Sequence, residues 1–293
     1  MKTKDCFFGQ VRALTSTHWG KLNTWTPESL NVTKQFGVTW NNITGMNPLH
    51  DQAPCRVIHQ SYGEMLATAA SGNYSFVNDF IEPNRDIEFY DQKIKEDYKS
   101  HYARLAQCLA IFWGVDQVLV HAEVEEFDFV IARQFDTVWK ADGSDLNGKI
   151  RHIFSDHTQT LSSTTPDIQS IPIVYVCGKN IQQEDQFTEF PVVGAMQCTS
   201  FIFNRAAARI MKNQLFDRSL EELDIVYKQI NTDLQSRLTS WELGYNIHRV
   251  FVKQDIHMID INRHNVLSIP PDWNPDISAD FAHIVRADCG KSD

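Results

Sequence analysis

The chain has 293 residues, of which 42% are hydrophobic and 22% are charged, and its formal net charge is -10. This size and composition are typical of one large globular domain and exclude a disordered protein. The negative charge argues against a protein that only coats nucleic acid, because phosphate contacts need Lys and Arg. A local basic cleft remains compatible with that charge.

No stretch of the sequence approaches about 18 consecutive apolar residues, so no membrane span is predicted. The residues after Met1 lack the apolar run of a signal peptide. The six cysteines are widely scattered and none has the close spacing of a zinc or redox motif, so we expect free, buried thiols. These features predict a cytoplasmic protein.

Short apolar runs that end at turn residues predict the strands of a sheet, and Gly9 ends the first of them. The expected strands cover residues 5–8, 36–40, 56–58, 127–132, 171–177 and 198–203.

Between these runs, apolar residues recur at three- and four-residue spacing and predict helices. One helix is expected over residues 92–115, with Gly114 as its C-cap. Asn204 is expected to cap a short helix, and residues 219–222 form a Ser-Leu-Glu-Glu capping box for another. Residues 268–293 contain three prolines and are expected to form an irregular tail.

Alternating strands and helices predict a single α/β domain over residues 1–293, with a mostly parallel central sheet flanked by helices. In such sheets ligands bind at the carboxyl ends of the strands. The residues that follow each strand are therefore the candidates for a functional site.

The first strand is followed by Gly9, Gln10 and Arg12. A glycine lets a ligand approach the backbone, and an arginine offers a planar fork to phosphate oxygens. A plain structural turn is the alternative interpretation. The segment is neither GxGxxG nor GxxxxGK[ST], which argues against a dinucleotide dehydrogenase and a P-loop kinase.

The strand over residues 127–132 is followed by Arg133 and Asp136. A carboxylate at this position could hold a divalent cation that bridges a pyrophosphate. The alternative is a buried salt bridge between Arg133 and Asp136.

Three segments together resemble bacterial and phage glycosyltransferases with the GT-A fold, which serve capsule and lipopolysaccharide synthesis. They are the Gly-Gln-x-Arg opening at residues 9–12, the strand that ends at Trp40, and the strand and turn over residues 127–136. The resemblance is best in the first half of the chain. Ala132 and Gln134 stand where that family often has two alternating arginines.

The resemblance implies a Rossmann-like GT-A domain that takes a sugar from a nucleotide diphosphate, with UDP as the expected nucleotide. It implies that the donor contacts Gly9, Gln10, Arg12, Trp40 and Arg133. It also implies that Asp136 binds the sugar or a metal ion, Mn²⁺ or Mg²⁺.

The same resemblance implies, less directly, further metal ligands and a catalytic base. His257, and after it His264, are the late histidines that could complete a metal shell. A carboxylate facing the acceptor would serve as a base in an inverting enzyme. The candidates for it are Glu242, Asp185, Asp167, Glu184 and Glu189.

Two other functions fit the same residues: a nucleotidyl or phosphoryl transferase, and a nucleotide-binding protein without catalysis. For a sugar transferase the acceptor is a surface glycan precursor or hydroxymethylcytosine in phage DNA. Lys140, Lys149 and Arg151, or Arg205, Arg209 and Lys212, could line a groove for DNA, although a solvated surface is the alternative.

Overall fold

The structure is a computed structural model of the chain. It describes residues 2–9, 32–40, 55–81, 101–134, 137–140, 170–179, 195–229, 250–251, 253–260 and 283–286. Within these ranges, no helix combines the length and apolar character needed to cross a membrane.

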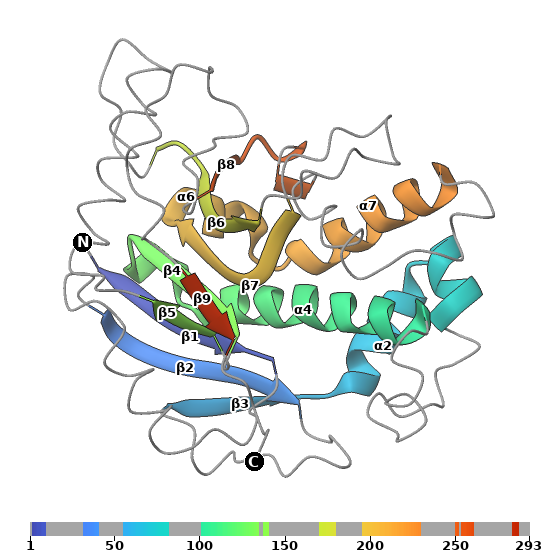
Figure 1. The fold of residues 1–293 in the computed structure, drawn as a ribbon, viewed down its shortest axis with the longest axis horizontal. Helices are drawn as coiled ribbons and strands as arrows, with labels where there is room; N and C mark the ends of the chain where they lie inside the picture. Colours follow the sequence, from blue (N-terminus) through green and yellow to red (C-terminus); the bar gives the residue numbers. More distant parts are fainter. Residues whose placement is uncertain are drawn as a thin grey trace.

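A seven-stranded sheet forms the centre of the molecule, in the order β3-β2-β1-β4-β7-β6-β8 (Figure 1). The strands are β1 (Thr3–Phe8), β2 (Val32–Trp40), β3 (Arg56–Gln60), β4 (Phe129–Gln134), β6 (Ile173–Lys179), β7 (Ala195–Asn204) and β8 (His257–Asp260). The six segments predicted as strands correspond to β1, β2, β3, β4, β6 and β7.

The sheet is parallel in one half and mixed in the other. β3, β2, β1 and β4 run parallel to one another. β7 is antiparallel to both of its neighbours, and β8 runs parallel to β6. The expected α/β architecture with a mostly parallel sheet is therefore present, with one reversed strand that the sequence did not predict.

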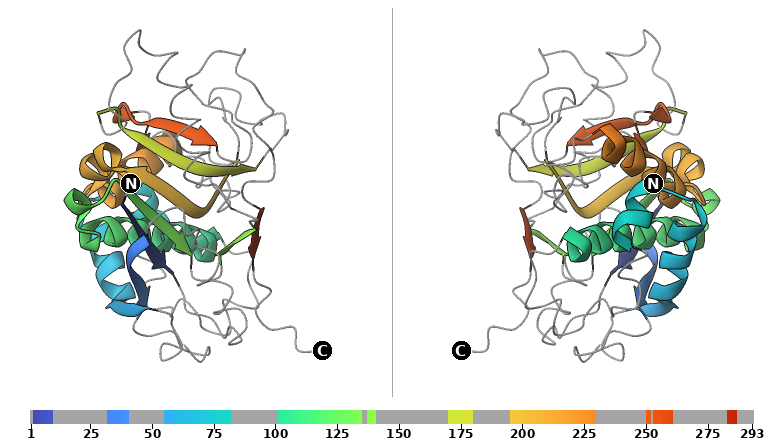
Figure 2. Two further views of the ribbon diagram at one scale, coloured as in Figure 1. Left: turned by 90° about the vertical axis from the view of Figure 1, so that its left-hand side faces the viewer. Right: turned by 90° about the vertical axis from the view of Figure 1, so that its right-hand side faces the viewer.

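A second, two-stranded sheet pairs β5 (Thr137–Lys140) with β9 (His283–Arg286) in antiparallel register. It lies on the side toward which β4 and β8 point (Figure 2). The tail over residues 268–293 is thus not irregular throughout. Its His-Ile-Val-Arg segment contains the β-branched residues that favour strands.

Helices cover one face of the main sheet. They are α2 (Tyr62–Ser71), α4 (His101–His121), α6 (Arg205–Met211) and α7 (Leu215–Gln229), with a π-helical turn η3 (Val77–Ile81) and a 3₁₀ turn η5 (Val124–Glu126). Alternate residues of the strands, such as Phe8, Val38, Val130 and Val176, pack with these helices into one buried cluster. Successive side chains of a strand point to opposite faces of the sheet, so every second residue faces the helices.

Helix α4 continues through Gly114, so the prediction that Gly114 ends the helix is wrong. A Cβ atom added at Gly114 would lie 3.1 Å from Phe8 Cβ. The glycine is used for the close approach of α4 to β1 and not for a cap. The local sequence around Gly114 does not distinguish a glycine that caps a helix from one that permits close packing.

The helices after β7 show one correct capping prediction and one error. Asn204 caps α6, because its side chain accepts a hydrogen bond from the Ala207 amide. Ser219 lies inside α7 and not at its start. Its hydroxyl donates to the carbonyl of Leu215, one turn earlier, so the local Ser-Leu-Glu-Glu pattern does not act as a capping box.

The other face of the main sheet is also buried, and it carries polar side chains. Asp5, Arg133 and Tyr175 all lie on it and are fully buried. Three of its hydroxyls, those of Thr3, Thr39 and Tyr175, have no hydrogen-bond partner in the described part of the chain. Burial raises the pKa of the Tyr175 phenol. The sheet thus separates an apolar, helix-covered face from a face rich in polar groups.

Candidate functional site

The carboxyl ends of β1 and β4 form a topological switch point. From β1 the chain proceeds outward to β2 and β3, and then returns to place β4 on the other side of β1. Ligands of open α/β sheets bind in the crevice outside such a reversal. The register pairs Phe8 with Gln134, so both strands end on the same rung of the sheet.

Gly9 leaves the sheet from this rung with a φ of +92°. This value lies in the region where side chains other than hydrogen are strained. The Cβ position of Gly9 has no atom within 4 Å, so the backbone conformation and not crowding requires glycine here. The predicted sharp turn after the first strand is confirmed.

The predicted donor segment also includes Gln10 and Arg12, which lie outside the described residues. Asp136 also lies outside them, between the last residue of β4 and the first residue of β5 in sequence. Both segments nevertheless depart from neighbouring parallel strands at one edge. The structure therefore shows the strand ends that precede them and not their side chains.

Arg133 is buried in the sheet and is held by Asp5 of β1. Its Nε donates to Asp5 Oδ1 at 3.0 Å, and its Nη2 donates to Asp5 Oδ2 at 2.5 Å. Both side chains are 0% exposed. The guanidinium also lies over the ring of Phe7, 4.5 Å from its centroid. Arg133 thus forms a buried salt bridge, as the alternative interpretation predicted. The predicted partner was Asp136, and the partner that the structure shows is Asp5.

Trp40 ends β2 at the same edge of the sheet, but its side chain belongs to the helix-covered core. It is 5% exposed and packs edge-on against Tyr62, with ring centroids 5.8 Å apart. The indole therefore supports the junction between β2 and α2. The structure does not place it on an open surface beside Gly9.

His257 begins β8 and pairs with Ile173 at the start of β6. Because β6 and β8 run in the direction of β1 and β4, their first residues lie at the opposite edge from Gly9. Burial lowers the pKa of His257, while Asp255 raises it. The structure thus does not bring His257 toward the end of β4.

A metal site was expected from Asp136 with His257. In the described ranges no group of three His, Cys, Asp or Glu side chains is placed to hold a metal ion. Of the two expected ligands, His257 lies at the far edge and Asp136 lies outside the described residues, so the described residues supply no metal shell. We therefore derive no step through a metal ion.

The remaining predicted residues fall outside the described ranges. They are the proposed bases Glu242, Asp185, Asp167, Glu184 and Glu189, the histidine His264, and the basic residues Lys149 and Arg151.

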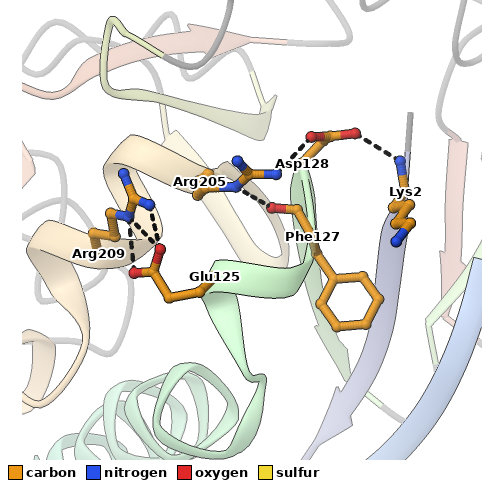
Figure 3. Close-up of polar contacts among 6 residues, drawn as sticks. All are labelled: Lys2, Glu125, Phe127, Asp128, Arg205 and Arg209. Atoms are coloured by element: carbon orange, nitrogen blue, oxygen red, sulfur yellow. Dashed lines mark hydrogen bonds and ion pairs between the residues drawn. The ribbon is translucent and has the colours of Figure 1, made fainter.

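In the second basic group, around α6, Arg205 and Arg209 are held by acidic partners (Figure 3). Arg205 donates to the Phe127 carbonyl at 2.7 Å and pairs with Asp128 at 2.8 Å. Arg209 forms an ion pair with Glu125, whose pKa this partner lowers. These pairs fasten α6 to η5 and to the start of β4.

Helix α6 follows the carboxyl end of β7, and β7 runs opposite to β4. The Arg205 and Arg209 pairs therefore lie at the amino edge of the parallel strands, away from the switch point. Their charges are compensated by Asp128 and Glu125, so this surface gives no support to a DNA groove beside the proposed site.

No known family model matches the chain, and no curated protein is significantly similar to it in sequence.

Cys6 of β1 and Cys55, which immediately precedes β3, carry thiols that are not activated. Cys6 is fully buried, and burial raises its pKa. The pKa of Cys55 is raised to about 12, mainly by burial and further by Asp5. Both thiols are free, as the sequence predicted for them. A thiolate nucleophile is not expected at either position, because reactivity follows the thiolate form.

Sequence reasoning missed Asp5, the partner of Arg133. A signal was present, because Asp5 precedes the apolar run Cys6-Phe7-Phe8, and an ionisable residue in a central strand is paired when it is buried. The identity of the partner could not be found from spacing, since 128 residues separate Asp5 from Arg133.

Proposed function

We propose that the chain is a glycosyltransferase of the GT-A type that binds a nucleotide-diphosphate sugar at the carboxyl edge between β1 and β4. The observation that carries this proposal is the switch point, where β1 ends at Phe8 beside Gln134 of β4. The order β3-β2-β1-β4 matches the first four strands of the Rossmann order 3-2-1-4-5-6, in which the switch point lies between strands 1 and 4.

Gly9 supports the assignment of the diphosphate to the β1 side of this edge. Its positive φ turns the chain sharply at the end of the strand, and its missing side chain leaves the backbone accessible. Arg12, three residues later, would supply a fork of N–H donors for the phosphate oxygens.

Asp136 would act from the β4 side, because it follows Gln134 by two residues in sequence. In the proposed arrangement its carboxylate faces the sugar or the diphosphate.

Acceptor activation requires a base, for which Glu242 and Asp185 are the proposed residues. A carboxylate that removes the proton from the acceptor hydroxyl lets the oxygen attack the anomeric carbon. We propose a surface glycan precursor as the acceptor. The paired state of Arg205 and Arg209 and the net charge of -10 give no support to DNA.

Calorimetric titration with UDP, a UDP-sugar and ADP, each with and without Mn²⁺, tests the donor class. The proposal expects UDP and the UDP-sugar to bind more tightly than ADP. Equal binding of all nucleotides, without any sugar turnover, would favour a non-catalytic nucleotide-binding protein. Release of pyrophosphate from a nucleoside triphosphate would favour a nucleotidyl transferase.

A labelled UDP-sugar, offered with a lipid-linked glycan and in parallel with hydroxymethylcytosine DNA, tests the acceptor. Label in the lipid fraction supports the proposed acceptor. Label in the DNA would replace it with DNA while leaving the donor assignment in place.

A further inference from the structure

The ion pair joins Asp5 in the middle of β1 to Arg133, which lies one residue before the end of β4 beside the proposed donor site. Arg133 pairs in register with Phe7, one rung before the final pair of Phe8 and Gln134. Gly9 then leaves β1, and the chain toward Asp136 leaves β4. Together with the contact between Arg133 and Phe7, the ion pair links the side chains of β1 and β4 on this face close to the point where both strands end.

The geometry of this link is more restrictive than a simple charge contact. Two parallel N–H donors of Arg133 meet the two oxygens of Asp5, which fixes the plane of both groups. Phe7 holds the guanidinium from its own rung through a 4.5 Å cation–π contact. The three side chains connect the pair of Asp5 and Ile131 with the pair of Phe7 and Arg133, which is the next pair on the same face. This connection restrains sliding and twisting of one strand end against the other.

Stability alone does not explain such a pair. Removing two charges from water is costly, and apolar residues of similar volume often replace a buried ion pair without loss of stability. Phe7, Phe129 and Ile131 are apolar neighbours on this face, which also carries the hydroxyls of Thr3 and Tyr175. An apolar pair would pack against these three side chains, so stability is not the expected benefit of the charged pair.

We propose that Asp5 and Arg133 are positioning residues that fix the ends of β1 and β4 relative to each other, and with them the two segments that must converge on the donor. The restraint on the strand ends follows from the geometry above, while its purpose rests on the proposed function. Neither side chain touches the donor in this account. Their effect is carried by Gly9 and by the residues after Gln134.

The proposal predicts a difference between binding and turnover. The segment after Gly9 can still bind the nucleotide when the pair is lost, so the donor KM changes by less than about threefold. The kcat falls by about 100-fold, because a displacement of about 1 Å between reacting groups has an effect of that size. A purely structural role would lower the amount of folded protein without separating KM from kcat.

The test uses the double variant Asp5→Leu/Arg133→Met, which replaces the ion pair by an apolar one. Hydrogen exchange is followed by mass spectrometry in peptides that cover the carboxyl ends of β1 and β4, with and without UDP. We expect exchange at these ends to rise by about tenfold or more, while the helices keep their protection and the melting temperature stays near that of the wild type.

The matched control is Lys4→Met/Glu123→Gln. It removes the 2.9 Å ion pair between Lys4 of β1 and Glu123. This pair lies on the helix-covered face, near the amino end of β1. Exchange at the carboxyl ends of β1 and β4 should remain unchanged in this variant. If the apolar double variant does not fold, Arg133→Lys is used, because it keeps the charge and loses the two-point geometry. It should show a smaller rise at the same ends.

Unchanged exchange at these ends in a folded variant without the Asp5–Arg133 pair would overturn the proposal. An equal rise in the Lys4 control would also overturn it, since the effect would then not belong to this pair. If UDP fails to protect these ends in the wild type, the donor-site proposal fails. The comparison of the variants without UDP still decides the positioning role in that case.

Discussion

Gly114 of α4 lies directly against Phe8 of β1, with no room for a side chain between them. An added Cβ would be 3.1 Å from both Cβ and Cδ2 of Phe8. Phe8 cannot easily yield, because it is fully buried and its strand is paired on both sides with β2 and β4. This contact sets the distance between the longest helix described and the central strand.

Gly114→Ala should therefore destabilise the protein, although alanine favours a helix. Overpacking outweighs the helix preference, and we expect a net loss of about 1–2 kcal/mol in urea unfolding. Gly63→Ala in α2 is the matched control, because its Cβ would meet Ser61 Oγ at an ordinary 3.6 Å. That variant should be neutral or slightly more stable. A stabilised Gly114→Ala protein would mean that the contact is looser than described.

Asp116 of α4 is nearly buried and accepts hydrogen bonds from the first amides of α7. Its Oδ1 lies 3.4 Å from the Phe216 amide nitrogen. Burial is the main cause that raises its pKa to about 6, while the backbone hydrogen bonds lower it. The folded state thus holds a proton at a pH where the unfolded chain has lost it.

The contribution of Asp116 to stability should therefore fall as the pH rises from about 4 to above 6, because the charged carboxylate is the form that burial disfavours. Asp116→Asn has no such proton to lose, and its stability relative to the wild type should increase over this range. Urea unfolding at several pH values measures the slope. Asp217→Asn, an exposed position in the same turn of α7, should keep most of the wild-type slope. An unaltered slope in Asp116→Asn would contradict the assignment.

Asn204 joins α6 to β6 as well as capping the helix. Its Oδ1 accepts from the amides of Ala207 and Ile173, both at 3.0 Å. Its Nδ2 donates to the Ile171 carbonyl at 2.6 Å. The side chain thus satisfies backbone groups of two elements inside the protein.

Asn204→Ala should cost about 2–4 kcal/mol, more than a surface cap, because it leaves buried backbone groups without this partner. Ser61→Ala removes the cap of α2, where Ser61 Oγ accepts from the Glu64 amide at an exposed site. That control should cost about 1 kcal/mol. Equal losses for the two variants, measured by chemical denaturation, would show that the contacts of Asn204 to β6 add nothing.

The sequence predicted β1, β2, β3, β4, β6 and β7, because their short apolar runs end at clear turn residues, but it did not predict β5, β8 or β9. The turn at Gly9 and the cap at Asn204 followed from local chemistry alone. The role of Gly114 could not be predicted, since it depends on Phe8, which is distant in sequence. The reversed direction of β7 could not be predicted either, because strand pairing is decided by packing between distant segments.

The candidate site also has features that the sequence could predict and features that depend on the fold. Its place at the end of β1 and β4 could be predicted from the strand pattern and the rule for parallel sheets. The pairing of Arg133 with Asp5 and the burial of Trp40 required the fold. The edge on which His257 lies also required the fold, because it depends on the parallel pairing of β8 with β6.

Arg12→Ala tests the diphosphate contact on the β1 side. Loss of a charge-assisted hydrogen bond should raise the donor KM by about tenfold or more. Melting temperature should change little. Arg209→Ala, at the opposite edge of the sheet, is the control and should leave the KM unaltered. An unchanged KM in Arg12→Ala would remove this residue from the donor site.

The most direct test of the central claim is UDP release from a panel of UDP-sugars, measured for the wild type, Asp136→Asn and Asp128→Asn. Asp128 precedes the same strand, at its amino edge, and pairs with Arg205. We predict turnover by the wild type and by Asp128→Asn, and loss of at least about 100-fold in a folded Asp136→Asn protein. Wild-type turnover in folded Asp136→Asn would contradict the role of Asp136, and absence of any UDP-sugar turnover in the wild type would contradict the account as a whole.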